Sequence, residues 1–417
     1  MTSVFSLYRQ AFSNLQKNVW ILSTAMFINR SGSMVLLFAS LYLTNELHFS
    51  ISEAGIIMSF LGAGGILGSY AGGWLTDRKN YHDIMLFSLI SSALILLLLL
   101  FATNAILIAM IIFCYSFAAD MFRPANGAAI ASFTSTQDRT RSISLVRLAA
   151  NLGFSVGPAI GGMIALYLGY KWLFIIDSVT SLTAAIMLRI YLPRQQPDKI
   201  PRDHSVLKNS STSAYRDWKY LIFILLVAAY GLCFFQIIAT IPQFFSKQCN
   251  YQEDKIGWLL ALNGFLVVVI EMPLITALQK KKNIFRFIIA GTLCIPVAFS
   301  MLLVGQCVLI WPVIYIVILT FSEIFAMPFM MNHALSQPLK ERQGQYAALY
   351  SIAFGIALMT APAIGLGIAG RFGFDTTFYF FSALSVVVAI GFALLKRKLD
   401  QDHKASLEIT ESFNTSG

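Results

Sequence analysis

A small set of ionisable side chains lies inside long apolar stretches of this sequence. A charge in such surroundings costs several kcal/mol unless it is paired or hydrated, so each is a candidate for proton binding, ion pairing or ligand binding. A buried carboxyl group can hold a proton, whereas a neighbouring cation favours its ionised form. The residues concerned are Arg30, Asp120, Arg123, Arg147, Asp177, Glu271 and Glu323.

The spacing of these residues separates paired from unpaired groups. Asp120 and Arg123 are three positions apart, so they share a helical face and can neutralise each other. Arg147 lies in the next apolar stretch, near enough to the same end to join that pair. Glu271 and Glu323 have no ionisable residue one turn away. An unpaired carboxyl group in apolar surroundings can hold a proton near neutral pH.

Roles follow from this spacing. The candidates for proton coupling are, in order, Glu323, Glu271 and Asp120. The candidate charge network that would face them consists of Arg30, Arg123 and Arg147. Asp177 lies near one end of its apolar stretch and is expected to be a structural cap or ion-pair partner.

Long apolar helices must position these side chains. Of 417 residues, 57% are hydrophobic and 12% are charged, and a soluble domain carries about 25% charged residues. The mean hydropathy is +0.70. An apolar helix of about 20 residues crosses the ~30 Å hydrocarbon core of a bilayer. Twelve such runs lie at 19–44, 53–76, 83–103, 104–133, 142–168, 172–193, 219–246, 256–279, 284–306, 308–334, 345–370 and 374–396. The sequence predicts an all-α membrane protein with twelve transmembrane helices.

Two phrases rich in helix breakers indicate that the chain is a duplication. SVGPAIGGMIA at 155–165 and TAPAIGLGIAG at 360–370 align at an offset of 204 positions, which pairs Pro158 with Pro362. The same offset pairs Pro124 with Pro328. Two six-helix units packed around a central cavity are typical of secondary transporters.

The duplication divides the chain into five predicted segments. Residues 1–18 form a cytoplasmic N-terminal segment, either an interfacial helix or a frayed tail. The two six-helix bundles cover 19–193 and 219–396, and a polar cytoplasmic loop at 194–218 joins them. Residues 397–417 form a cytoplasmic tail.

The formal net charge of +10 is distributed as membrane topology requires. In alternate loops, one side of the predicted membrane holds most Lys and Arg residues, including the runs at 280–282 and 396–398. The other side holds only Lys171, Lys247, Lys255 and Arg371. The positive-inside rule then places both termini in the cytoplasm. The basic charge is therefore a topology signal, and no nucleic-acid partner is expected.

The cysteines suggest neither a metal site nor a disulfide framework. They are Cys114, Cys233, Cys249, Cys294 and Cys307, they share no metal-ligand spacing, and all but Cys249 lie in apolar runs. They are expected to be packing residues.

Three motifs resemble the major facilitator superfamily, and the likeness extends over essentially the whole chain. GGWLTDRKNYH at 72–82 resembles the family's Gly-x-x-x-Asp-Arg signature between helices 2 and 3, although its second half departs from the pattern. RPANG at 123–127 resembles the helix-4 motif, with Asn in place of the usual Gln. GFSVGPAIGG at 153–162 matches the helix-5 motif of proton-driven drug and metabolite exporters.

The resemblance implies a role for each motif. It implies two pseudo-symmetric six-helix bundles around a central cavity, with a cytoplasmic gate in which the carboxylate latches the two halves. The gate residues are Gly73, Asp77 and Arg78, and the helix-4 motif residues are Asn126 and Gly127. The helix-5 motif offers small residues for close helix packing, at Gly153, Gly157, Pro158, Gly161 and Gly162.

Arg30 departs from the resemblance. Many proton–drug antiporters carry an acidic residue in helix 1, where this chain has Arg30. Two alternatives remain: Arg30 binds an anionic group of the substrate, or it forms a salt bridge to Glu271 or Glu323 that holds the halves together.

These observations predict an exporter of small amphipathic molecules (drugs, metabolites, peptides or siderophores) in exchange for protons. The alternatives are a proton-coupled importer on the same fold and a channel or sensor that has lost transport. No phosphate-binding loop for ATP, catalytic constellation or metal site is found, so neither an ATP-driven pump nor an enzyme is expected. The proton gradient is the expected energy source, with no cofactor. A monomer in the cell membrane, contacting lipid, substrate and protons, is predicted.

Overall fold

The structure, a computed structural model, describes residues 15–76, 78–135, 138–194, 216–278, 284–305, 307–335 and 343–415. Residues 1–14 of the predicted N-terminal segment, Asp77 of the predicted gate and most of the central loop lie outside these ranges. Within them the chain is helical, and no strand occurs. The all-α class predicted from composition is confirmed.

The first half of the chain forms the helices of one bundle. They are α2 (Lys17–Gly32), α3 (Val35–Leu41), η1 (Tyr42–Glu46), α4 (Ile51–Thr76), α5 (Tyr81–Leu97), η2 (Leu98–Leu100), α6 (Ala105–Asp120), α7 (Phe122–Phe133), α8 (Arg139–Tyr167) and α9 (Lys171–Tyr191). We call these residues the N-half.

The second half forms the other bundle, the C-half. Its helices are α10 (Trp218–Phe234), η5 (Phe235–Ile237), α11 (Thr240–Lys247), α12 (Glu253–Leu278), α13 (Ile284–Gly305), α14 (Ile310–Leu335), α15 (Gln343–Phe372) and α16 (Phe374–Thr415). Among the described residues, 11 helical segments are long and apolar enough to cross a membrane. Helix α12, 26 residues long, occupies the place of the eighth predicted span.

Local sequence explains where several helices begin. The Asn80 side chain accepts a hydrogen bond from the His82 amide at 2.9 Å and caps α5. Asn104 caps α6 in the same way, through the Ile106 amide at 2.8 Å. These amides have no partner inside their helix, so a side-chain acceptor stabilises the helix start.

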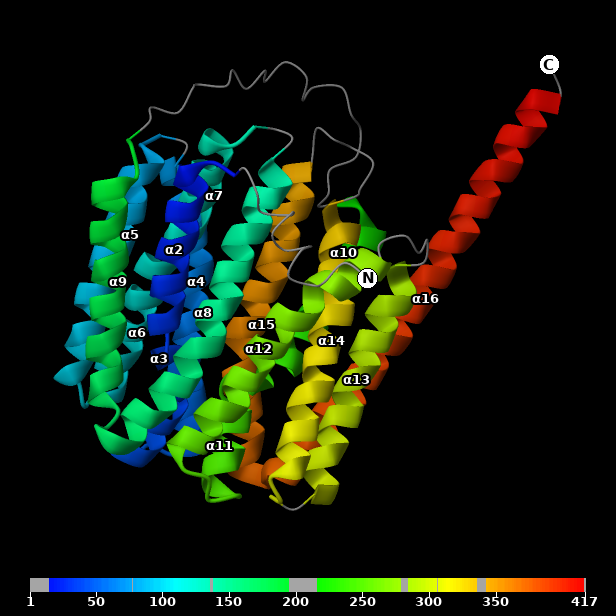
Figure 1. Cartoon of the computed structure of the whole chain (residues 1–417). Coiled ribbons are helices and arrows are strands. Elements are labelled where there is room, and N and C mark those ends of the chain that lie inside the picture. The colour runs from blue at the N-terminus through cyan, green and yellow to red at the C-terminus, as the bar shows by residue number, and fades with distance from the viewer. Residues whose placement is uncertain are drawn as a thin grey trace, which may run out of the picture.

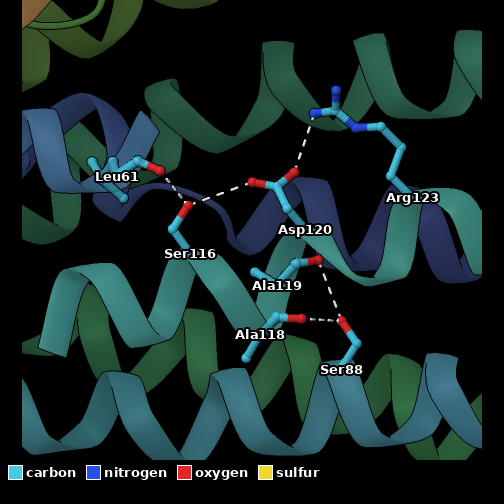
Figure 2. A network of polar contacts seen from close by, with 7 residues as sticks. All are labelled: Leu61, Ser88, Ser116, Ala118, Ala119, Asp120 and Arg123. Carbon is cyan, nitrogen blue, oxygen red and sulfur yellow. Dashed lines mark hydrogen bonds and ion pairs between the residues drawn. The ribbon is translucent and has the colours of Figure 1, made fainter. Parts of the chain in front are cut away.

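A proline explains the break in the fourth predicted span. Helix α6 ends at Asp120 and α7 begins at Phe122. Pro124 has no amide hydrogen, and its ring clashes with the carbonyl four residues earlier, which belongs to Asp120. Ser88 of α5 donates to the Ala118 carbonyl at 2.6 Å, so a polar group at the break is satisfied by a neighbouring helix (Figure 2).

The two bundles stand side by side, with the N-half in blue to green and the C-half in green to red (Figure 1). Two ends can be distinguished. The basic end is where α4 ends and α5 begins, and the far end is where α8 ends and α9 begins. The last helix, α16, runs 42 residues without interruption, so the predicted tail at 397–417 begins inside it (Figure 1).

The duplicated phrases pack against equivalent partners in opposite halves. A Cβ on Gly55 of α4 would lie 2.6 Å from the Pro362 carbonyl of α15. A Cβ on Gly257 of α12 would collide with the Pro158 carbonyl of α8. Because a glycine without a Cβ lets the carbonyl of the facing proline approach closely in both places, the same contact joins the halves twice.

One prediction about the cysteines was wrong. Cys249 and Cys307 form a disulfide at the far end, between the α11–α12 and α13–α14 connections. They are 58 positions apart in the sequence and meet because those two connections lie side by side in the fold. Cys114, Cys233 and Cys294 are free thiols.

Candidate functional site

An ion pair joins the two halves at the centre of the candidate site. Arg147 of α8 pairs with Glu271 of α12. The Glu271 side chain is 10% exposed and that of Arg147 is 49% exposed, so the carboxylate is buried while its partner reaches it from a more open position. The expectation that Arg147 joins Asp120 and Arg123 was therefore wrong, because its helix faces α12 of the other half.

Glu323 lies beside this pair. The side-chain amide of Asn263, on α12, donates to Glu323 Oε2 at 3.2 Å and to Thr320 Oγ1 at 3.0 Å. Arg147 interacts electrostatically with both Glu323 and Tyr350 of α15. Helices α8, α12 and α14 thus bring one guanidinium and two carboxyl groups into one neighbourhood, and α15 adds the Tyr350 hydroxyl.

The charge balance of this group gives it a chemical capability. Arg147 neutralises the carboxylate of Glu271. Among the described contacts, the Glu323 carboxylate accepts a hydrogen bond from the neutral Asn263 amide and interacts electrostatically with the Arg147 guanidinium. A carboxylate in such surroundings is stabilised by gaining a proton or a cationic partner. Carboxyl groups in such surroundings have the chemistry to take up a proton when their cation is withdrawn. We call Arg147, Glu271, Glu323 and Asn263 the coupling site.

Asp120 and Arg123 form a second, local pair. Their side chains are 3.3 Å apart, as the spacing of three residues predicted. Ser116 donates to the Leu61 carbonyl at 2.6 Å and lies 3.4 Å from Asp120 Oδ2 (Figure 2). Arg123 is 70% exposed and Asp120 is 22% exposed, so this pair is far more accessible than Glu271.

Arg30 belongs to the N-half charges. It interacts electrostatically with Asp120, Asp177 and Arg123, all in the N-half. The structure does not show the alternative in which Arg30 forms a salt bridge to Glu271 or Glu323, because Glu271 is paired with Arg147 and Glu323 is not among the groups that act on Arg30. The other alternative, an anion-binding Arg30, stays a prediction.

Asp177 is almost fully buried in α9. Its side chain is only 1% exposed, and Tyr115 Oη lies 3.5 Å from its carboxylate. Asn29, next to Arg30 on α2, donates to Ser181 of α9 at 3.1 Å. Asp177 on the supporting helix α9 therefore lies within electrostatic reach of Arg30 on α2, and its role as a cap or ion-pair partner stays a prediction.

The helix-5 motif packs against two neighbouring helices, α2 of its own half and α12 of the opposite half. Gly153, Gly157 and Gly161 pack against α2 and the Met34 side chain that follows it, within the N-half. Gly162 packs against the Glu253 backbone of the other half. The Ser155 hydroxyl, inside the same motif, donates to the Ala261 carbonyl of α12 at 3.1 Å. The motif therefore brings helix 5 close both to its own bundle and to the opposite one.

The other two motifs lie partly within the described residues. Asp77 lies outside the described residues, so its predicted gating contact is not seen. Arg78 stacks on the Trp74 ring at 3.8 Å, and a Cβ on Gly73 would touch only Pro124, at 4.0 Å. In the helix-4 motif Asn126 is buried. No atom lies within 4 Å of the position a Gly127 Cβ would take.

Sequence reasoning missed Asn263 and Tyr350. It considered charged residues in apolar stretches, and both of these are neutral. A search that also counted amides in apolar helices would have found Asn263, which precedes Glu271 by two turns. Tyr350 carries no comparable signal, because hydroxyl-bearing aromatics are frequent in this chain.

Comparison with known proteins agrees with this architecture. A model of the Major Facilitator Superfamily matches residues 21–357. The uncharacterised MFS-type transporter YqjV of Bacillus subtilis is 24% identical over 405 residues, which cover 93% of this chain and 96% of that protein. Multidrug resistance protein 2 of the same organism is 22% identical, over 94% of this chain and 98% of its own.

Solved structures share the fold. A POT family transporter in complex with 5-aminolevulinic acid aligns with a TM-score of 0.78 and 14% identity, covering 93% of this chain and 97% of its own. At this identity the likeness concerns the fold alone. The family model spans most of the chain and the helices have the matching arrangement, so the chain belongs to the Major Facilitator Superfamily of membrane transporters.

Proposed function

We propose that this protein is a secondary active transporter that exports small amphipathic molecules in exchange for protons. The observation that carries the proposal is the coupling site, in which the C-half carboxylates Glu271 and Glu323 depend on Arg147 of the N-half. A site built from both halves changes whenever the halves move relative to each other. Proton binding there is thereby linked to alternating access.

The exchange follows from charge balance. While Arg147 is paired with Glu271, Glu323 is left with the Asn263 amide as its direct hydrogen-bond donor. A proton on Glu323 removes its charge, and a cationic group of a substrate would neutralise that charge in the proton's place. The two occupants exclude each other, which is the condition for exchange. The proton gradient supplies the energy, and no other cofactor is part of the proposal.

Topology sets the direction of proton flow. The basic end carries the Lys and Arg clusters that favour the cytoplasm. The disulfide lies at the far end, and disulfides persist in oxidising compartments outside the cytosol. Both observations support a cell-membrane protein with cytoplasmic termini and an extracellular far end. Protons would enter from the far end, and substrate from the basic end.

Export is favoured over import by the helix-5 motif and by the names of relatives. The motif is complete from Gly153 to Gly162. Several similar proteins are named as multidrug resistance proteins, among them the Bacillus subtilis protein that aligns over 94% of this chain. A proton-coupled importer remains the second candidate, because the fold is common to both directions.

The test uses inverted membrane vesicles that contain the protein and an imposed pH gradient, followed with a pH-sensitive dye. A panel of lipophilic dyes and drugs is added, one compound at a time. An exporter dissipates part of the gradient when a substrate is present, and vesicles carrying Glu323→Gln do not. Uptake into intact cells that is accelerated by external acid would show an importer instead.

Asp77 has its own role in the proposal. In the family this carboxylate latches the cytoplasmic side, and its loss leaves the central site untouched. Asp77→Asn is therefore expected to abolish transport while substrate binding stays within a few-fold of the unmodified protein. Normal transport by a folded Asp77→Asn protein would exclude the latch.

A further inference from the structure

A cluster of hydrogen bonds ties the two halves together at the far end. Tyr170, between α8 and α9, donates its hydroxyl to Glu253 Oε1 at 2.5 Å. The Asn45 side-chain amide, in η1, donates to the Tyr170 hydroxyl at 3.1 Å and lies 3.4 Å from Ser246 Oγ of α11. Each of these residues lies at or next to an end of a helix, so the cluster joins helix ends of opposite halves.

The electrostatics favour the Tyr170–Glu253 contact. Burial and the hydrogen bond to Glu253 raise the pKa of Tyr170 above its ordinary value, so the hydroxyl stays protonated and donates at every working pH. Hydrogen bonds to a charged acceptor are stronger than those between neutral groups. The Glu253 backbone also packs against Gly162, which leaves no room for the helices to slide past each other. The halves cannot separate at this end unless the contact breaks.

The disulfide lies in the segment that presents Glu253. Cys249 is bonded to Cys307, and the Tyr251 hydroxyl donates to the Cys307 carbonyl at 2.5 Å. The Tyr251 amide donates to the Phe245 carbonyl at 2.9 Å. Residues 249–253 are thereby anchored at three points on the surrounding helices and loops.

The backbone of this segment needs such anchors. Asn250 has a φ of 50° and Cys307 a φ of 62°, both in the left-handed region that side-chain-bearing residues rarely adopt. Conformations of this kind persist only when surrounding contacts hold them. Removal of the covalent anchor would let the segment relax, and Glu253 lies four residues after Cys249.

We propose that the Cys249–Cys307 disulfide is a positioning element of the far-end contact. It holds residues 249–253 so that Glu253 meets Tyr170, and it thereby slows the separation of the halves on the extracellular side. The role rests on the alternating access of the proposed function but not on its direction, its substrate or its proton coupling.

The test measures how often the far end opens. Leu366 of α15 is fully buried, and its Cβ faces Gly55 of the opposite half. The reporter variant Leu366→Cys reacts with a membrane-impermeant maleimide only when the halves part. Labelling at position 366 is followed by peptide mass spectrometry in reconstituted vesicles, with no substrate and no proton gradient. Failure of the exporter proposal therefore leaves this readout unaffected.

In the protein that carries Leu366→Cys, the added pair of changes Cys249→Ser and Cys307→Ser is expected to make position 366 react about tenfold faster than in the reporter alone. A change of about tenfold is the effect of losing one charged hydrogen bond. Tyr170→Phe is expected to accelerate labelling to the same degree. The two changes together should be no faster than the faster of them, because both remove one contact. Cys233→Ser, which removes a free buried thiol, is the matched control and should label at the reporter's rate.

Reversible reduction of the native disulfide tests the same role without the serine variant, so misfolding of that variant cannot explain the result. A membrane-impermeant phosphine, with water, reduces the disulfide to two thiols and is itself oxidised to the phosphine oxide. Labelling at 366 should accelerate after reduction from the far end and return after reoxidation. The proposal is overturned if reduction and the serine variant leave the labelling rate unchanged while Tyr170→Phe accelerates it, or if the effects of Tyr170→Phe and the serine variant multiply.

Discussion

The two halves share one architecture but treat their intramembrane charges differently. In the N-half, Asp120 pairs with Arg123, and Arg30 interacts with the buried Asp177. In the C-half, Glu271 takes its cation from Arg147 of the opposite half. Apart from Arg147, these N-half charges can therefore stay together in any arrangement of the bundles, whereas the C-half carboxylates depend on that arrangement. Under the proposed function, this dependence makes the C-half the expected place for proton coupling.

The same contrast appears in the backbone. Pro124 and Pro328 occupy equivalent positions in the repeat, yet the fourth span breaks at Met121 while α14 continues through Pro328. In the N-half Ser88 satisfies the Ala118 carbonyl beside the break. Equivalent prolines are therefore found at a helix break in one half and in a continuous helix in the other. At the break, the Ser88 side chain of a neighbouring helix stabilises the free carbonyl.

The largest expected effect comes from removing the cation that crosses the halves. Arg147→Met strands the buried Glu271 and should destabilise the protein by about 3 kcal/mol, at the low end for buried pairs because Arg147 is half exposed. Thermal unfolding in detergent measures it. Arg123→Met, the matched N-half change, removes an exposed cation and should cost less than about 1 kcal/mol.

A compensating change sharpens this test. Arg147→Met combined with Glu271→Gln removes both charges of the ion pair, so stability should largely return although transport does not. If Arg147→Met and Arg123→Met destabilised the protein equally, the contrast between the halves would be lost.

A smaller effect should be shared by the two halves, because the glycine contacts are repeated. A Cβ on Gly62 would collide with the Met359 backbone, and a Cβ on Gly264 would lie 2.8 Å from Ser155 Cα. Gly62→Ala and Gly264→Ala should each destabilise by about 1–3 kcal/mol through overpacking. Gly127→Ala is the control, since its Cβ would meet no atom within 4 Å. Thermal unfolding of the three variants decides, and an equal loss for Gly127→Ala would refute the interface account.

The smallest effect concerns the helix break. Ser88→Ala removes a hydrogen bond to a buried carbonyl and should cost about 1 kcal/mol. Ser91→Ala is the comparison, because the Ser91 hydroxyl bonds only the carbonyls of its own helix, at Phe87 and Ser88. Chemical unfolding of both variants gives the difference. A loss at Ser91 as large as that at Ser88 would show that the break needs no support from α5.

The sequence predicted the features that are local or repeated. Helix positions followed from apolar runs, the duplication from the phrases around Pro158 and Pro362, and the Asp120–Arg123 pair from a spacing of three. The Arg147–Glu271 pair did not follow, because it joins residues 124 positions apart. Which faces of α8 and α12 meet depends on how two bundles pack, and apolar periodicity is weak when lipid surrounds both. The disulfide was also missed because it joins residues 58 positions apart, in two connections that meet only in the folded chain.

The most direct test of the account is the pH dependence of substrate binding by Glu323→Gln. A compound that dissipates the gradient in vesicles is titrated onto the purified protein from about pH 5 to about pH 9. For the unmodified protein, affinity should fall as the pH falls, because protons and substrate compete for Glu323. Glu323→Gln should bind with an affinity that does not change with pH, whereas Asp120→Asn should keep the dependence. An unchanged pH dependence in Glu323→Gln would contradict the assignment of the coupling site.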